Sequence, residues 1–186
     1  MCNKKKILLI LDEVQCGIGR SGHLFAHQYY GVFPDVMALA KGLGGGFPIG
    51  ACLTNNAVGK TMVVGTHGST FGGNPLATAV ANAVMDLLLE DECLSGVVQK
   101  GEYLRDELSG LQVKYPKLID SVHGLGLMIG VKCKIPNTDL ANALKDRGLL
   151  VVGSGSNMVR LLPPLNIEHS HLEAAIGIMD SALGEM

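Results

Sequence analysis

The sequence contains no tryptophan and few aromatic residues of any kind, since Phe, Tyr and Trp together make up 4% of its 186 residues. Single-stranded nucleic acid is bound largely by stacking bases on aromatic rings, so this composition disfavours such a partner. The charge is equally unfavourable, because 15 basic residues against 17 acidic ones give a net charge of -2. A phosphate backbone or an anionic membrane surface calls for a basic excess. We therefore expect no nucleic-acid partner.

Long apolar runs and paired cysteines are also missing. No run approaches the roughly 20 residues of a membrane span. The basic start Asn3-Lys4-Lys5-Lys6 precedes only a short apolar run that ends at Asp12, unlike a secretory signal peptide. The five cysteines are odd in number, scattered and never spaced as C-x-x-C, which fits neither a disulfide framework nor a zinc site. We expect a cytoplasmic protein with no membrane segment and no metal.

Three short apolar runs predict the strands of one sheet. The run Ile7–Leu11 is continuous rather than alternating, which is typical of a strand buried on both faces of a parallel sheet. Runs at 36–40 and 49–53 follow at spacings too long for tight hairpins. These spacings favour an open α/β sheet. Glycine is abundant, with 25 residues gathered mainly in a few loops, where the backbone turns tightly or closely approaches another group.

Helices and shorter elements follow the predicted sheet. Asn74 and Pro75 have the residue types of an N-cap and a first helical position, and the helix they begin, to residue 90, is apolar around most of its surface, which predicts deep burial. We place a domain boundary in the next helix, 94–111, and predict domains at 1–100 and 101–186. The second domain should be a smaller α+β unit. Its expected elements are 118–123, 127–132, 138–147, 149–152, 158–162 and a last helix with the capping box Ser170-x-x-Glu173.

The sequence matches two nucleotide-binding motifs only in part. The apolar run before Asp12 resembles a Walker B strand, and Gly59-Lys60-Thr61 could end a Walker A loop. Thr54 stands where that loop needs glycine, and the order of the two motifs is inverted, so an NTPase is disfavoured. The stretch Gly17–Gly22 matches G-x-G-x-x-G, but residues 12–16 separate it from the strand and place two carboxylates where a pyrophosphate would bind. We interpret it as a structural loop.

Asp12 and Lys41 form a more informative pair, because each follows an apolar run. Lys41 also precedes the glycine-rich stretch 42–46. Taken singly, a strand-end aspartate is often a cap and a lysine beside glycines is usually solvated. Together they suit pyridoxal phosphate, which needs a lysine amine for a Schiff base and an acid beside its pyridine nitrogen. Parallel strands that end at one sheet edge would bring the two groups to one crevice.

Longer stretches of the sequence resemble one known family. The sequences of three segments closely resemble motifs of the class III, fold type I pyridoxal-phosphate aminotransferases: Leu11–Gln15, Ala40–Gly50 and Thr66–Leu76. The resemblance implies an α/β fold: part of the large domain of a fold type I PLP-transferase, with a mostly parallel sheet and helices, and then a small α+β C-terminal domain. Members of this family are much longer, and the chain resembles their C-terminal half. When Val159–Asn166 is included, these motifs are most similar to those of acetylornithine aminotransferases. Ornithine, succinylornithine and 4-aminobutyrate aminotransferases share most of the same motifs.

The resemblance implies roles for four residues around pyridoxal 5'-phosphate. Lys41 would hold the cofactor covalently and, once displaced by substrate, carry the proton between the substrate Cα and the cofactor. Burial and a cationic neighbourhood would lower its pKa for this task. Asp12 would pair with the pyridinium nitrogen, Val14 would lie against the ring, and Gln15 would hydrogen-bond the phenolic oxygen. Asp12 and Val14 share a side-chain direction if the strand continues past Asp12.

Two further implied roles concern a partner subunit and the substrate. Thr70, with Ser69 beside it, would reach the cofactor phosphate of the neighbouring subunit, so that the active sites are shared in a homodimer. Arg160 would clamp the α-carboxylate of the substrate, for which a planar guanidinium offers two parallel hydrogen bonds. An arginine inside the apolar run 158–162 is otherwise costly.

The function implied by the resemblance is transamination of N-acetylornithine with 2-oxoglutarate, a step of arginine biosynthesis, in a two-step ping-pong cycle. The partners would be the amino acid and 2-oxo acid substrates and a second copy of the chain. In relatives, the part preceding the Asp12 strand carries the loop that binds the cofactor phosphate. The alternative is a non-catalytic truncated remnant that keeps the small domain and the dimer surface but binds cofactor poorly or not at all.

Overall fold

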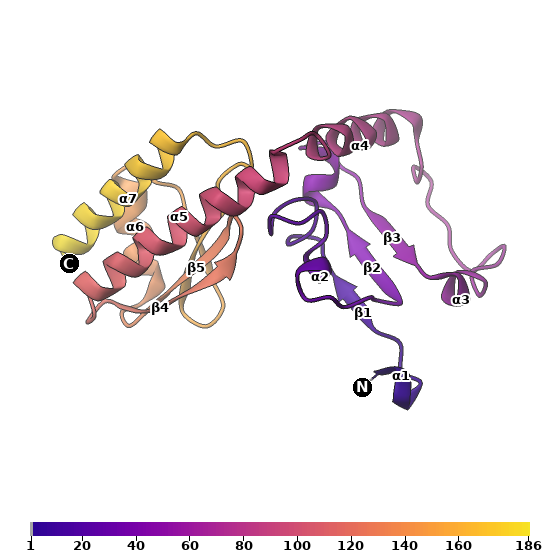
Figure 1. Ribbon diagram of the computed structural model, residues 1–186, viewed down its shortest axis with the longest axis horizontal. Coiled ribbons are helices and arrows are strands. Elements are labelled where there is room, and N and C mark those ends of the chain that lie inside the picture. Colours follow the sequence, from indigo (N-terminus) through magenta and orange to yellow (C-terminus); the bar gives the residue numbers. More distant parts are fainter. Residues whose placement is uncertain (1) are drawn as a thin grey trace. The chain divides into compact units, whose positions relative to one another are not determined.

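We analysed a computed structural model of the chain, which describes residues 2–186 (Figure 1). The chain divides into two compact units, one reaching to Leu94 and the other running from Ser95 to Met186. The division lies within helix α5, Cys93–Lys114, the helix in which the sequence placed a domain boundary. The functional assignment of 1–100 and 101–186 stays a prediction. Within residues 2–186, the helices are all too short or too polar to cross a membrane.

The first unit is built on a three-stranded sheet of order β1-β2-β3. Strand β1, Ile10–Asp12, runs parallel to β2, Val36–Leu39, as predicted. Strand β3, Ala51–Thr54, runs antiparallel to β2, unlike the mostly parallel sheet that the sequence suggested. A parallel crossover needs a dozen or more residues, and the chain between β2 and β3 is shorter. That connection forms the 3-10 helix η1, Lys41–Gly44, and then reverses at Gly45 and Gly46, with φ of 54° and 111°.

The predicted burial of the first unit is wrong at two elements. Ile7, Leu8 and Ile10 are more than half exposed, because β1 forms an edge of the sheet. Helix α4, Pro75–Leu88, buries only Ala77, Ala81 and Leu88, since one face packs against η1 and the others lie open. Its predicted start is confirmed: the Asn74 side chain accepts a hydrogen bond from the Ala77 N–H at 2.9 Å.

Three short helices complete the first unit. They are α1 (Cys2–Lys5), α2 (Ala26–Tyr29) and α3 (Asn56–Gly59). The last is capped by Asn55, whose side chain accepts a hydrogen bond from the Val58 N–H at 3.0 Å. The segment from Lys60 to Gly73 connects α3 and α4 (Figure 1), and all of its residues are exposed. This exposed segment includes Val64 and Phe71.

The second unit is an α+β unit with an antiparallel four-stranded sheet of order β4-β5-β7-β6. Its strands are β4 (Ile119–Leu125), β5 (Met128–Cys133), β6 (Val152–Ser154) and β7 (Met158–Leu161), and its other helices are α6 (Asn137–Asp146) and α7 (His169–Gly184). Alternate strand residues form one core with the three helices, for example Val131, Val159, Leu104, Leu140 and Met179. The remaining strand residues face the other side of the sheet.

The start of α7 differs from the predicted capping box. The helix begins at His169 with Glu168 in the N-cap position, and no side chain of Glu168 caps it. Ser170 therefore lies within the first turn. Glu173 instead approaches His169, with 3.5 Å between Oε1 and Nε2. The capping box pattern was right about the approximate place of the helix and wrong about its first residue.

Candidate functional site

Asp12 and Lys41 lie at the same edge of the first sheet. Asp12 ends β1 and is paired in parallel register with Ala38 of β2. Lys41 follows β2 after a single residue, Ala40, and is the first residue of η1. Because the two strands are parallel, their carboxyl ends present the carboxylate and the amine at one edge, the usual place for ligands in open α/β sheets. The structure thus brings together the acid and the amine that the sequence singled out.

The backbone at Lys41 is strained. Its φ of 47° lies in the left-handed region, which costs of order 1 kcal/mol for a residue other than glycine. The neighbouring loop supports this conformation, because buried Ile18 packs against η1, where a Cβ on Gly42 would lie 3.3 Å from that of Ile18. The G-x-G-x-x-G stretch, Gly17–Gly22, therefore packs against the helix that carries Lys41, as expected of a structural loop.

Glu13 has a role that the sequence analysis missed. Its side chain is 2% exposed, and its two carboxylate oxygens accept hydrogen bonds from the backbone N–H groups of Ala26, at 2.6 Å, and His27, at 2.8 Å. These are the first N–H groups of α2, where a carboxylate is favoured. Burial, and after it the charge of Glu13, raises the pKa of the Cys16 thiol. Glu13 lies far from α2 in sequence, so no local pattern could reveal the contact.

Val14 and Gln15 lie in the turn after β1 rather than in a continued strand. The strand ends at Asp12, and the Val14 N–H donates to Asp12 Oδ1 at 3.0 Å, so the chain turns at once. The strand does not continue past Asp12, so the condition under which Asp12 and Val14 would share a side-chain direction is not met. Both Val14 and Gln15 are half-buried. Their predicted contacts with the cofactor ring stay a prediction.

Ser69 and Thr70 lie in the exposed segment 60–73, away from any buried cluster. The Ser69 carbonyl accepts a hydrogen bond from the Gly72 N–H at 3.3 Å, which shapes the turn before α4. Such a position leaves both hydroxyls accessible to another molecule. Their predicted contact with a partner's cofactor phosphate stays a prediction.

The residues at the β1–β2 edge fit the ring end of pyridoxal phosphate. Asp12 is exposed and uses Oδ1 for its own turn, which leaves Oδ2 for a protonated ring nitrogen. Within residues 2–186, no hydrogen bond or ion pair engages the exposed Lys41 amine. An acid and an amine that share an edge without neutralising each other form the donor set that this cofactor requires.

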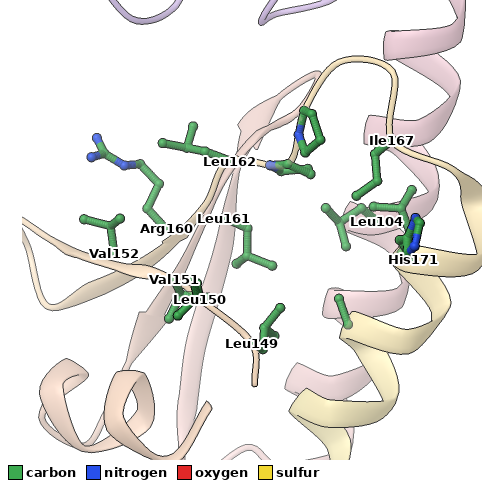
Figure 2. A pocket seen from close by; sticks show the side chains of 14 residues that line it. Leu104, Leu149, Leu150, Val151, Val152, Arg160, Leu161, Leu162, Ile167 and His171 are labelled. Carbon is green, nitrogen blue, oxygen red and sulfur yellow. The ribbon is translucent and has the colours of Figure 1, made fainter. Parts of the chain in front are cut away.

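Arg160 lies in the second unit, on β7. It is half-buried and pairs with Gly130 of β5 and Val152 of β6. In Figure 2, Leu161 points toward Leu104, whereas Arg160 extends away from it. One cavity of about 370 Å³, lined mainly by apolar side chains, lies between the β6–β7 strands and helices α5 and α7, and Arg160 is at its margin.

Comparison with known proteins identifies the same family that the sequence motifs indicated. The family model for aminotransferase class-III matches residues 1–183. The curated acetylornithine aminotransferase of Mesorhizobium japonicum is 49% identical over 176 residues, which cover 95% of this chain and 44% of the relative. That of Brucella melitensis is 46% identical over 183 residues, or 98% of this chain and 45% of the relative.

Solved structures agree with these relatives. The acetylornithine aminotransferase from Elizabethkingia anophelis superimposes with a TM-score of 0.91 at 38% identity, over 100% of this chain and 47% of that one. The ornithine aminotransferase from Toxoplasma gondii gives a TM-score of 0.92 at 33% identity, over 99% and 45%.

The similarity covers only part of the length of each relative. The chain spans less than half the length of each of these relatives. A share of length does not say which part is matched, so the assignment to a C-terminal half stays a prediction. The match nevertheless runs through almost every residue of this chain, including Asp12, Lys41 and Arg160. By its sequence and by its fold, the chain belongs to the class-III aminotransferase family.

Proposed function

We propose that the chain carries the acid and the amine of an aminotransferase that moves an amino group from N-acetylornithine to 2-oxoglutarate. The observation that carries this proposal is the placement of Asp12 and Lys41 at the carboxyl ends of two paired parallel strands. The names of the relatives support the choice of N-acetylornithine, since the curated matches described above are acetylornithine aminotransferases. Ornithine, succinylornithine and 4-aminobutyrate are the alternative amino donors.

Each candidate site residue of this chain would have its own role in the reaction. Pyridoxal phosphate, when bound, supplies an electron sink that stabilises negative charge at the substrate Cα. Asp12 would keep the ring nitrogen protonated, because a carboxylate favours a cation beside it. The Lys41 amine would take the proton from the substrate Cα and return it as general acid. Val14 and Gln15 would hold the ring in place, and Arg160 would bind the carboxylate of the substrate.

We also propose that the protein works as a homodimer in the cytoplasm. The exposed segment 60–73 supports a second copy as partner, because it presents Val64 and Phe71 to solvent beside the hydroxyls of Ser69 and Thr70. Apolar side chains gathered on a surface mark interaction sites. The cytoplasmic setting is supported by the cysteines, all five of which are free thiols, as in a reducing compartment.

Borohydride reduction in the presence of pyridoxal phosphate tests the central assignment. The reduction fixes the cofactor on the lysine that binds it, and peptide mapping then locates it. We expect the label on Lys41, its loss in Lys41→Ala and its retention in Lys60→Ala, since Lys60 is the matched lysine beside a glycine. A label that is equal on Lys60, or that survives Lys41→Ala unchanged, would refute the assignment.

A non-catalytic remnant is the second candidate, and the exposure of Lys41 favours it for the chain alone. A lysine that forms a Schiff base is typically desolvated in an apolar pocket, whereas Lys41 is open to water. Transamination by the purified chain, followed with N-acetylornithine and 2-oxoglutarate, separates the two candidates. Turnover above that of Lys41→Ala would exclude the remnant.

A further inference from the structure

Asp12 and Glu13 are adjacent carboxylates with opposite surroundings. The Asp12 side chain is exposed, whereas Glu13 is 2% exposed. A carboxylate is costly to bury unless hydrogen bonds satisfy it. The groups that satisfy Glu13 therefore hold it firmly, at a point that directly adjoins the acid of the candidate site.

Four hydrogen bonds fix Glu13 in place. Its two carboxylate oxygens accept from the first N–H groups of α2, as described above. Its own N–H donates to the Ala38 carbonyl of β2 at 3.0 Å, and its carbonyl accepts from the Gly17 N–H at 3.1 Å. We call residues 13–17 the Glu13 turn. Through Glu13, this turn is tied to β2 on one side and to α2 on the other.

Gly17 shows how closely the turn fits around Glu13. A Cβ on Gly17 would lie 2.9 Å from the Glu13 carbonyl oxygen and 3.1 Å from Glu13 Oε2. The φ of Gly17 is not in the left-handed region that favours glycine. Glycine therefore serves here to allow the close approach of Glu13 rather than an unusual backbone angle.

The orientation of the Asp12 carboxylate depends on the same turn. The Val14 N–H donates to Asp12 Oδ1 at 3.0 Å. Val14 directly follows Glu13 in the chain, so the bonds that hold Glu13 also set the direction of this N–H. Because Oδ1 is held in this way, the direction of the other oxygen, Oδ2, is fixed as well.

The Glu13 turn also lies against the elements that carry the amine. The Cβ position on Gly17 is 3.1 Å from Leu39 Cδ2, at the end of β2. The next residue, Ile18, packs against Gly42 of η1, the helix that begins at Lys41. One buried glutamate thus anchors the turn that lies between the acid and the amine of the candidate site.

We propose that Glu13 is a positioning residue, which holds the turn that orients Asp12 and thereby determines how well Asp12 binds a cationic ring nitrogen. Glu13 itself touches neither cofactor nor substrate in this assignment. The part that concerns the ring nitrogen rests on the proposed function, whereas the orientation of Asp12 by Glu13 requires no cofactor. If Glu13 only capped α2, its replacement would leave Asp12 unaffected.

Amide hydrogen exchange of the full chain, followed by NMR, tests the first part without cofactor. In Glu13→Gln the side chain keeps its size, but its NH2 group faces one of the two α2 N–H groups, donor against donor. We expect the Val14 N–H to exchange roughly tenfold faster, as loss of a hydrogen bond to a carboxylate implies. Gln28→Ala is the matched control, because Gln28 caps the same helix through the Phe25 N–H at 3.0 Å. It should leave exchange at Val14 unchanged.

Gly17→Ala provides the second variant, which retains the Glu13 carboxylate. Its methyl group would press on the Glu13 carbonyl oxygen, which belongs to the backbone. We expect faster exchange at Val14 in this variant also. It tests the same link from the other end of the turn, even if Glu13→Gln does not fold.

Nitrogen NMR of isotope-labelled pyridoxal phosphate, fixed on Lys41 by borohydride, tests the second part. The chemical shift reports protonation of the ring nitrogen, and an opposite charge within about 4–6 Å shifts a pKa by about 1–3. Glu13→Gln should lower the pKa of the ring nitrogen, Asp12→Asn should lower it further, and Gln28→Ala should not change it.

Three results would overturn the proposal. They are equal exchange at Val14 in the wild type, Glu13→Gln and Gly17→Ala, an equal rise in Gln28→Ala, and a ring-nitrogen pKa that Asp12→Asn lowers but Glu13→Gln does not. If Val14 responds but borohydride does not label Lys41, the proposed function fails alone. If Lys41 is labelled but neither Val14 nor the ring nitrogen responds to Glu13→Gln, this inference fails alone.

Discussion

Helix α5 passes so close to the turn between β4 and β5 that one methyl group should disturb the second unit. Gly101 is buried in α5, and a Cβ built on it would lie 2.5 Å from the carbonyl carbon and 2.7 Å from the Cα of Gly126. Both atoms belong to the backbone, so no side-chain rotation can relieve the contact. Gly101→Ala therefore forces the helix and the sheet apart.

The magnitude follows from a matched pair of substitutions on the same helix. Gly110 is also in α5, and a Cβ there would meet no atom within 4 Å. Alanine in a helix is better than glycine by about 0.5–1 kcal/mol, so Gly110→Ala should raise the free energy of unfolding by that amount. Overpacking costs about 1–3 kcal/mol, and rigid backbone on the far side indicates the upper part of this range. We expect Gly101→Ala to lower the free energy of unfolding by about 2 kcal/mol.

Urea unfolding followed by circular dichroism measures both values from the transition midpoints. Because the propensity gain is common to both variants, their difference isolates the cost of the contact with Gly126. Midpoints that shift equally, or a Gly101→Ala midpoint at or above that of the wild type, would show that α5 does not press on this turn.

Three further predictions concern single side chains. Glu13→Gln should lower the free energy of unfolding by about 1.5–3 kcal/mol, since a carboxylate that caps α2 with two hydrogen bonds is lost; thermal unfolding measures it. Hydrogen bonds, above all from Lys114, hold the pKa of the Asp180 carboxyl in the folded protein below its usual value. The stability that they contribute is therefore present at pH values above the pKa of Asp180 in the unfolded chain, and it is lost as the pH falls through the lower pKa of the folded state. Asp180→Asn should thus lower Tm at neutral pH, with a difference that shrinks in acid. Asn137→Ala removes two bonds to the β6–β7 turn, which hydrogen exchange should report as faster opening there.

The parts of the fold that the sequence predicted well are those determined by local chemistry. Asn74 and Pro75 mark the start of α4 because capping and a fixed proline φ act within one turn. The shared edge of Asp12 and Lys41 could be predicted because a parallel strand pair fixes which ends meet. Both inferences require only neighbouring residues and one topological rule.

The parts that failed depend on contacts distant in sequence. Burial of Ile7–Leu11 was predicted from apolar character, but burial requires neighbours, and β1 lies at an edge of the described sheet. The cap of α2 by Glu13 and the pairing of Arg160 with Gly130 join residues on different elements. No period or motif in the sequence encodes such pairings.

The exposed setting of Lys41 leads to a last prediction, that this chain by itself holds pyridoxal phosphate weakly. Lys41 is open to water, and a bond between its amine and the cofactor aldehyde is reversible by hydrolysis. Ser69 and Thr70, the residues implied for the phosphate, lie in the exposed segment 60–73, where they offer hydroxyls but no positive charge. Binding through the ring end alone should therefore be lost during dialysis, as measured by visible absorbance before and after. Retention at micromolar affinity would show that the chain has a phosphate site among residues not assigned to it here.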